Sequence, residues 1–229
     1  LGDIIELIKE ERATDILYYI GEDLKEMILE LLDNNKKTSI ESSLLAKTIQ
    51  QSKLADLAGL YEVKPVEVAV EEIGNEENYN INELAIIYKN MSVLKSAEIL
   101  SKLEDDKFIE ELFASIRKEE ELNNEGDSIT NEISKSIQFI TEYDKKIEDL
   151  VIVYEKMSPD KVAKIVEQMM SNDTKVTVLE IFSEPAFEIS DASIIIDVLS
   201  RIKNKTLSNI MNYVSEDKAS TLTQMLARP

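Results

Sequence analysis

The strongest constraint on the fold of this chain is an internal repeat. The segment LVIVYEKMSPDKVAKIV (residues 150–166) lies 66 positions after LAIIYKNMSVLKSAEIL (residues 84–100), and eight of the 17 aligned positions carry the same residue. In both copies the apolar residues fall at steps of three and four, which is the spacing of one helix face. Such a repeat is typical of helical hairpins that stack because none of them can bury its own apolar face alone.

A third, weaker copy precedes these two. Leu57-Ala-Gly-Leu-Tyr61 resembles Leu84-Ala-Ile-Ile-Tyr88, and Pro65 and Ala69 follow one residue out of register. The common unit is a helix that ends in Tyr, a short turn, and a second helix with a buried Ala. The small Ala lets a neighbouring helix approach closely, and the Tyr supplies a large apolar ring with a polar hydroxyl.

The segment between residues 129 and 157 contains neither Gly nor Pro and predicts one helix of about 28 residues, roughly 40 Å long. Its apolar residues alternate steps of four and three, a period typical of a coiled-coil seam, and Asp144 is the only break. A long helix buried against its own domain gives the same pattern, so a homodimer and a spacer within one chain both fit. The candidate interaction residues of this seam are Ile133, Ile137, Ile140, Ile147, Val151 and Tyr154.

Polar segments indicate where the chain divides. The charged run KEEELNNEGD (residues 118–127) predicts the main boundary. Before it we expect an acidic helical repeat domain at 1–124, and after it a linker helix at 128–157 and a C-terminal helical domain at 158–229. The fold class predicted is all-α: a superhelical stack of short helical hairpins in two subdomains joined by the long helix.

Local signals place some helix ends. Ser158-Pro159-Asp160 supplies a capping hydroxyl, a Pro at the first helical position and an acidic side chain near the positive end of the helix dipole. The polar run Asp33–Ser39 predicts a turn before the next helix, and EEIGNEENYN (residues 71–80) predicts a loop. Glu184-Pro185 predicts a turn within an otherwise helical series.

The charge balance excludes some partners. The chain has 46 acidic and 26 basic side chains, a net charge of −20. Non-specific nucleic-acid binding depends on neutralising phosphates with basic residues, so this composition argues against nucleic acid. It argues equally against an anionic membrane surface.

The residue types present also argue against enzymatic chemistry. The chain has no Cys and no His, which excludes thiol nucleophiles, His-based triads and the usual zinc sites. Paired carboxylates occur at Glu110-Glu111 and Glu119–Glu121, but they lie in helical charge runs without a Gly-rich loop beside them. We therefore expect no catalytic residues, no cofactor and no metal site, and a function that depends on protein contacts.

One stretch resembles a known family. LVIVYEKMSPDKVAKIVEQM (residues 150–169) is similar to the MgtE N-terminal superhelical domain, and more closely to its version in flagellar MotE-type proteins and the spirochaetal collar protein FlbB. The tail YVSEDKASTLTQMLA (residues 213–227) also resembles the end of that domain. Two departures stand out: Lys164 replaces the second Ala of the family's Ala-Ala pair, and an acidic helical domain stands where such proteins carry a membrane anchor and plain coiled coil.

The resemblance implies a non-enzymatic adaptor of the bacterial flagellar motor, a scaffold or chaperone of stator or collar components. It further implies a periplasmic location, with the native protein anchored to the inner membrane by a segment before Leu1; a cytoplasmic location is the alternative. It also permits a cytosolic Mg²⁺-sensing domain of an MgtE-type channel, and a FliG-like switch component is a further alternative. Oxygen ligands for Mg²⁺ would come from two acidic segments, Glu71, Glu72, Glu76 and Glu77, and Glu104, Asp105 and Asp106.

Overall fold

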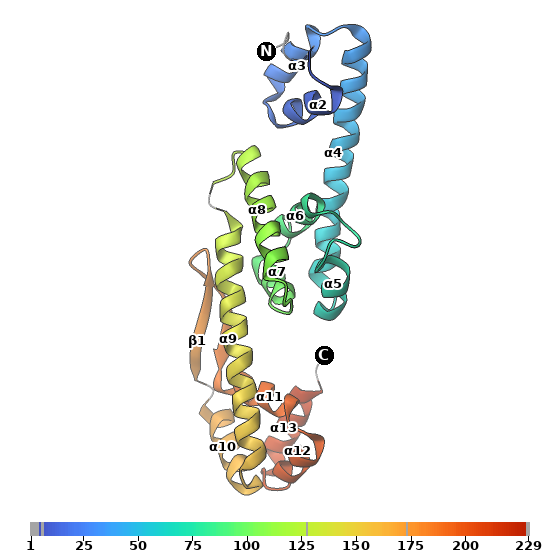
Figure 1. The fold of residues 1–229 in the computed structure, drawn as a ribbon. Coiled ribbons are helices and arrows are strands. Elements are labelled where there is room, and N and C mark those ends of the chain that lie inside the picture. The colour runs from blue at the N-terminus through green and yellow to red at the C-terminus, as the bar shows by residue number, and fades with distance from the viewer. Residues whose placement is uncertain (1–4, 6, 127, 173, 228–229) are drawn as a thin grey trace. The chain divides into compact units, whose positions relative to one another are not determined.

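The computed structural model describes residues 5, 7–126, 128–172 and 174–227 and divides the chain into two compact units, Leu1–Asn131 and Glu132–Pro229. The described chain is mostly helical, which confirms the predicted all-α class, but it also contains one two-stranded sheet (Figure 1). Among the described residues, no helix combines the length and the apolar character that a membrane span requires.

Unit 1 is built around one long helix. Its elements are α2 (Glu10–Tyr19), α3 (Glu22–Glu30), α4 (Asn34–Val63), α5 (Val66–Ile73), α6 (Ile81–Lys89), α7 (Val93–Leu100) and α8 (Asp106–Leu122). The predicted polar turn at Asp33–Ser39 is wrong, because α4 begins within it. The carboxylate of Asp33 accepts hydrogen bonds from the backbone N–H groups of Asn35 and Lys36, and this cap starts the helix ten residues before its first pair of leucines.

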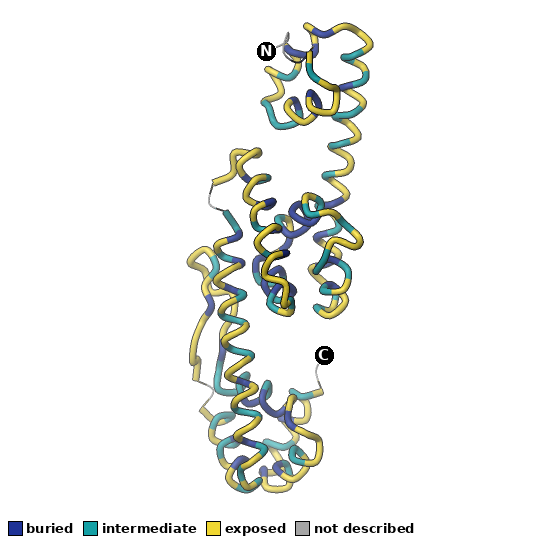
Figure 2. The backbone as a smooth tube through the Cα atoms, viewed as in Figure 1, coloured by how far each residue is buried: buried dark blue, intermediate teal, exposed yellow. Residues whose placement is uncertain are grey.

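Each end of α4 has its own core. The first half packs with α2 and α3 around Ile5, Ala13, Leu17, Ile28, Leu29, Leu32 and Ile40. The second half packs against α6, which also contacts α8. Leu84–Tyr88 of α6 are buried without exception, because this helix is covered on several sides (Figure 2).

The repeat predicted from the sequence is present as helix–turn–helix units. The three units are the helix pairs α4–α5, α6–α7 and α9–α10. The Tyr residues near the ends of the first helices are buried, and so are the Ala residues of the second helices: Tyr61, Tyr88 and Tyr154, and Ala69, Ala97 and Ala163. The shared residues are therefore packing residues in all three copies.

Unit 2 combines a long helix with four shorter helices and a hairpin. Its elements are α9 (Ile129–Lys156), whose first three residues belong to unit 1, and then α10 (Pro159–Asn172), β1 (Lys175–Ile181), β2 (Glu184–Ser190), α11 (Asp191–Arg201), α12 (Asn204–Met211) and α13 (Glu216–Leu226). The 28 residues of α9 confirm the predicted long helix. Its second half packs with the C-terminal helices around a core of Ile147, Tyr154, Val162, Ala163, Val166, Ile195, Val198, Leu199, Ile202, Ile210, Val214 and Leu222.

The β-hairpin corrects the expectation of a continuous helical series. β1 and β2 pair antiparallel with Leu179 opposite Phe187, and the hairpin lies beside α9, where the rings of Phe139 and Phe187 meet edge to face with centroids 6.4 Å apart (Figure 1). The β-branched residues of KVTVLEI favour a strand over a helix. Periodicity alone could not separate the two for so short an apolar run.

The two residues at the turn of this hairpin have a strained backbone conformation. Phe182 and Ser183 have φ of 52° and 65°, the left-handed region that Asn and Gly adopt most readily and Phe rarely does. We expect Phe182→Asn with Ser183→Gly to stabilise the hairpin by about 1 kcal/mol, since it removes strain at both positions. Slower hydrogen exchange at the β1 amides would measure the gain. Phe182→Ala with Ser183→Ala is the control, and equal protection in both variants would show that loss of the exposed ring is the cause.

Candidate functional site

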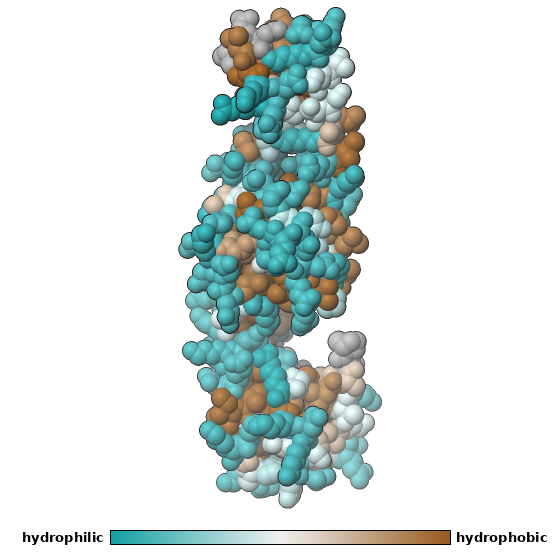
Figure 3. All heavy atoms as spheres, turned by 45° about the vertical axis from the view of Figure 1, so that its right-hand side comes forward, coloured by the Kyte–Doolittle hydropathy of each residue, from teal (hydrophilic) through white to brown (hydrophobic). Residues whose placement is uncertain are grey.

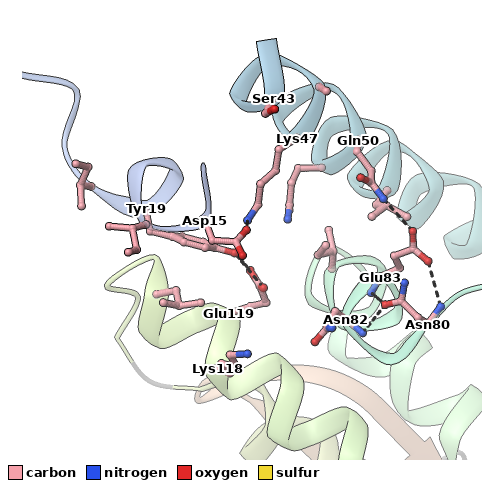
Figure 4. Close-up of a pocket in the computed structure, with 17 residues that line it drawn as sticks. Asp15, Tyr19, Ser43, Lys47, Gln50, Asn80, Asn82, Glu83, Lys118 and Glu119 are labelled. Atoms are coloured by element: carbon pink, nitrogen blue, oxygen red, sulfur yellow. Dashed lines mark hydrogen bonds and ion pairs between the residues drawn. The ribbon is translucent and has the colours of Figure 1, made fainter. Parts of the chain in front are cut away.

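A groove of about 900 Å³ lies in unit 1 between α2, α4, α6 and α8 (Figure 4). Its apolar lining comes from all four helices: Ile16, Ile20, Ala46, Leu54, Ile86 and Leu122. Polar side chains surround this lining: Asp15, Tyr19, Ser43, Lys47, Gln50, Gln51, Asn80, Asn82, Glu83, Lys118 and Glu119. The groove thus has an apolar floor with polar side chains around it, several of which bond across it to a neighbouring helix.

Lys47 of α4 is held against α2. Its ammonium nitrogen lies 2.7 Å from Oδ1 of Asp15. The same nitrogen lies 4.8 Å and 5.0 Å from the ring centroids of Tyr18 and Tyr19, within the range of a cation–π contact. One cation therefore joins a carboxylate and two aromatic rings on the neighbouring helix.

Tyr19 joins α2 to α8. Its hydroxyl donates to the carboxylate of Glu119, with oxygen–oxygen distances of 3.1 Å and 3.0 Å. Burial, followed by the negative charge of Glu119, raises the pKa of Tyr19 above its ordinary value. The phenol therefore stays protonated across the physiological pH range and keeps its role as donor.

Gln50 joins α4 to the start of α6. Its amide nitrogen donates to Oε1 of Glu83 at 2.9 Å, while Oε2 of Glu83 accepts from the backbone N–H of Asn80 at 3.1 Å. Oδ1 of Asn80 in turn accepts from the N–H groups of Asn82 and Glu83, which completes a capping box. Glu83 thus serves the helix start and the inter-helix contact together.

Three of the seven acidic residues considered as Mg²⁺ ligands have partners for their carboxylates within the chain. Glu72 forms an ion pair with Lys64, whose hydrogen bond lowers the pKa of the Glu72 carboxyl. Glu76 accepts from the N–H of Ile81 at 3.1 Å, and Asp105 caps α8 by accepting from the N–H of Phe108 at 3.0 Å. Within the described ranges, no group of three or more His, Cys, Asp or Glu side chains is arranged to hold a metal ion.

Two of the carboxylates considered for catalysis, Glu119 and Glu120, bond to groups that lie outside α8. Glu119 accepts from Tyr19, and Oε1 of the buried Glu120 accepts from the backbone N–H of Ile129 at 2.9 Å, at the first residue of α9. A carboxylate at the start of a helix is stabilised by the positive end of the helix dipole. The arrangement explains these two residues as connectors of helices.

The structure places the six predicted interaction residues on one face of α9. Ile133, Ile147 and Tyr154 are buried, and Ile137, Ile140 and Val151 are half-buried. Ile147 and Tyr154 belong to the core of unit 2, and Val151 packs against it. This is the burial expected of a helix packed in its own domain, while the homodimer through residues 129–157 stays a prediction.

Carboxylates of one helix also hold the start of a later helix. Oε2 of Glu62 accepts from the N–H of Ser92 at 2.9 Å, and Oε1 of Glu167 accepts from the N–H of Ser215 at 2.7 Å. Glu155 receives both the N–H of Lys203, at 3.3 Å, and its ammonium group, at 2.9 Å. The three contacts fix α7, α13 and α12 against earlier helices of their own units.

The contacts of Glu155 and Glu167 predict acid sensitivity of unit 2. The hydrogen bond from the Lys203 side chain lowers the pKa of Glu155, and the backbone hydrogen bond from Ser215 lowers that of Glu167. A depressed pKa gives stability that is present above the unfolded-state value of about 4.3 and lost as pH falls through the lower folded-state value. We expect the melting temperature of unit 2 to hold above about pH 5 and to fall below about pH 4.

The matched variant is Glu155→Gln with Glu167→Gln, which keeps an acceptor oxygen at each place and removes the charge. Its melting temperature should change less between about pH 6 and pH 3.5 than that of the unmodified chain. An unchanged pH dependence would mean that other carboxylates carry the acid sensitivity.

Most of the contacts that form the groove could not be predicted from the sequence, because they join residues that are far apart in the chain. Asn80-x-x-Glu83 is a readable capping box, but Tyr19 and Glu119 are 100 positions apart and no local pattern connects them. Comparisons with protein-family models, with curated proteins and with solved structures found no match to this chain. Its function must therefore be argued from its own residues.

Proposed function

We propose that this chain is a non-enzymatic adaptor that acts through protein–protein contacts in the bacterial flagellar motor, as a scaffold or chaperone of a stator or collar component. The observation that carries the adaptor role is the repeated helix–turn–helix unit. Its recurring Tyr and Ala residues are buried in all three copies, so the repeated residues build a scaffold of helices. Stacked helical repeats present extended surfaces to partners.

Exposed apolar side chains on this scaffold support the same role. They occur on α4, in the hairpin and directly after α3, among them Leu45, Phe182 and Leu31. Figure 3 shows apolar side chains gathered in patches between hydrophilic ones on the face drawn there. Such patches on a chain of this charge are suited to protein contacts.

The motor assignment is supported by the resemblance of residues 150–169 and 213–227 to flagellar MotE-type proteins and FlbB. From the same resemblance we propose a periplasmic location and an inner-membrane anchor in the native protein. Stator or collar components are the proposed partners. The superhelical arrangement of the hairpins belongs to the same proposal.

The test is genetic. Deleting the gene in its native bacterium should reduce swimming in soft agar without slowing growth, and a fluorescent fusion should form foci at flagellar bases. Normal swimming combined with a growth defect at low Mg²⁺ would contradict the motor role and favour the Mg²⁺-sensing alternative. Diffuse fluorescence with normal swimming and normal growth would contradict both.

A further inference from the structure

Helix α3 and Leu31, the residue that caps its C-terminus, carry an exposed apolar stripe. Leu24, Met27 and Leu31 are spaced by three and four residues, so they share one face, and they are 45%, 63% and 69% exposed. Ile28 and Leu29 lie further round the helix from this stripe and are buried in the N-terminal core. The helix is therefore anchored by one set of apolar residues while it presents a second set to solvent.

An acidic stripe runs beside this apolar stripe. Asp23, Glu26 and Glu30 each directly precede one of the three apolar residues, which places them about 100° further round the helix. All three are exposed. Lys25, the single basic residue of α3, bonds to Glu22 at 2.7 Å and points to the other side of the helix. The apolar stripe thus lies between the buried face and a row of three carboxylates.

We infer that α3 is a docking surface for a basic amphipathic helix of a partner protein. Such a helix would place its apolar residues against Leu24, Met27 and Leu31, the spacing by which helices recognise one another. Lys or Arg residues on one flank would then face Asp23, Glu26 and Glu30. The inference adds a partner chemistry to the adaptor role and stands without the flagellar assignment.

The charge of the surface decides between possible occupants. A second copy of the chain pairing α3 on α3 antiparallel would bring the carboxylate stripe against the same stripe, and like charges that face each other across an interface oppose association. An anionic lipid surface would meet the same repulsion. A basic amphipathic helix would bury the apolar stripe and place positive charges opposite the carboxylates.

The experiment uses the full chain and a fluorescein-labelled peptide of about 18 residues, composed of Leu and Lys with Leu at helical spacing of three and four. We expect saturable 1:1 binding by fluorescence anisotropy in about 0.15 M salt. Met27→Ser with Leu31→Ser should weaken it about tenfold or more. Glu26→Gln with Glu30→Gln should weaken it about threefold at that salt and much less at about 0.5 M, where charges are screened.

Matched controls separate this site from general attraction to an acidic protein. Leu60→Ser with Val63→Ser changes two exposed apolar residues of α4 in the same unit and should leave the affinity unchanged. A peptide of equal composition with Leu scattered around the helix should bind at least about tenfold more weakly. Equal binding by the two peptides, or equal loss in the α3 and α4 variants, would overturn the inference. So would a chain that dimerises through α3, seen as loss of the dimer in the Met27→Ser, Leu31→Ser variant.

Discussion

Tyr88→Ala should destabilise unit 1 by about 3–5 kcal/mol. Tyr88 is fully buried in α6, and its hydroxyl donates to the carbonyl oxygen of Ile73 at 3.0 Å. Removing the side chain leaves a cavity beside α6 and removes the hydrogen-bond donor from the Ile73 carbonyl at the end of α5. Urea unfolding followed by circular dichroism would show a lower midpoint for the transition of unit 1.

Two variants separate the contributions at this position. Tyr88→Phe keeps the ring and removes only the hydrogen bond, so we expect a loss of about 1–2 kcal/mol from the unpaired Ile73 carbonyl. Tyr213→Ala removes an exposed ring in unit 2 and should change stability by less than about 0.5 kcal/mol. A Tyr88→Ala midpoint equal to that of Tyr213→Ala would show that the repeated Tyr does not hold the unit together.

The parts of the fold predicted from sequence are those with local causes. The helix start after Ser158 follows from a capping residue and the apolar spacing that comes after it. The bounds of α9 follow from a run without Gly or Pro. Each cause acts within a few residues, so the sequence displays it directly.

The missed parts depend on contacts between distant residues or on weak local signals. The start of α4 depended on Asp33, which favours a turn and a helix cap equally. The turn of the hairpin is formed by Phe182 and Ser183, and the sequence lacks the Asn-Gly pair that usually marks such turns. The groove joins Asp15 to Lys47 and Tyr19 to Glu119, pairs that periodicity within one helix cannot indicate.

The apolar face of α9 shows a further limit of pattern reading. A coiled-coil seam and a helix buried in its own domain both require apolar residues at steps of three and four. The sequence alone therefore does not decide between a dimer seam and an internal core for Ile147 and the other apolar residues of this face. In the structure Ile147 packs in a core with the chain's own C-terminal helices. Substituting Ile147 therefore tests whether this face of α9 is an internal core or a dimer seam.

Ile147→Ala should destabilise unit 2 by about 2–5 kcal/mol, because it opens a cavity in the core that α9 shares with the C-terminal helices. If this core is complete within one chain, the unfolding midpoint of the unmodified chain will stay the same across about a hundredfold range of protein concentration. A dimer seam predicts instead that the midpoint rises with concentration, since association stabilises only the folded state.

The control lies on the same helix. Ile152→Ala changes an exposed Ile of α9 and should alter stability by less than about 0.5 kcal/mol if that face meets only solvent. A large, concentration-dependent loss at Ile152 would move the dimer contact to the exposed side of α9. A concentration-dependent midpoint abolished by Ile147→Ala would instead establish the seam as an interface between two chains and contradict its role as an internal core.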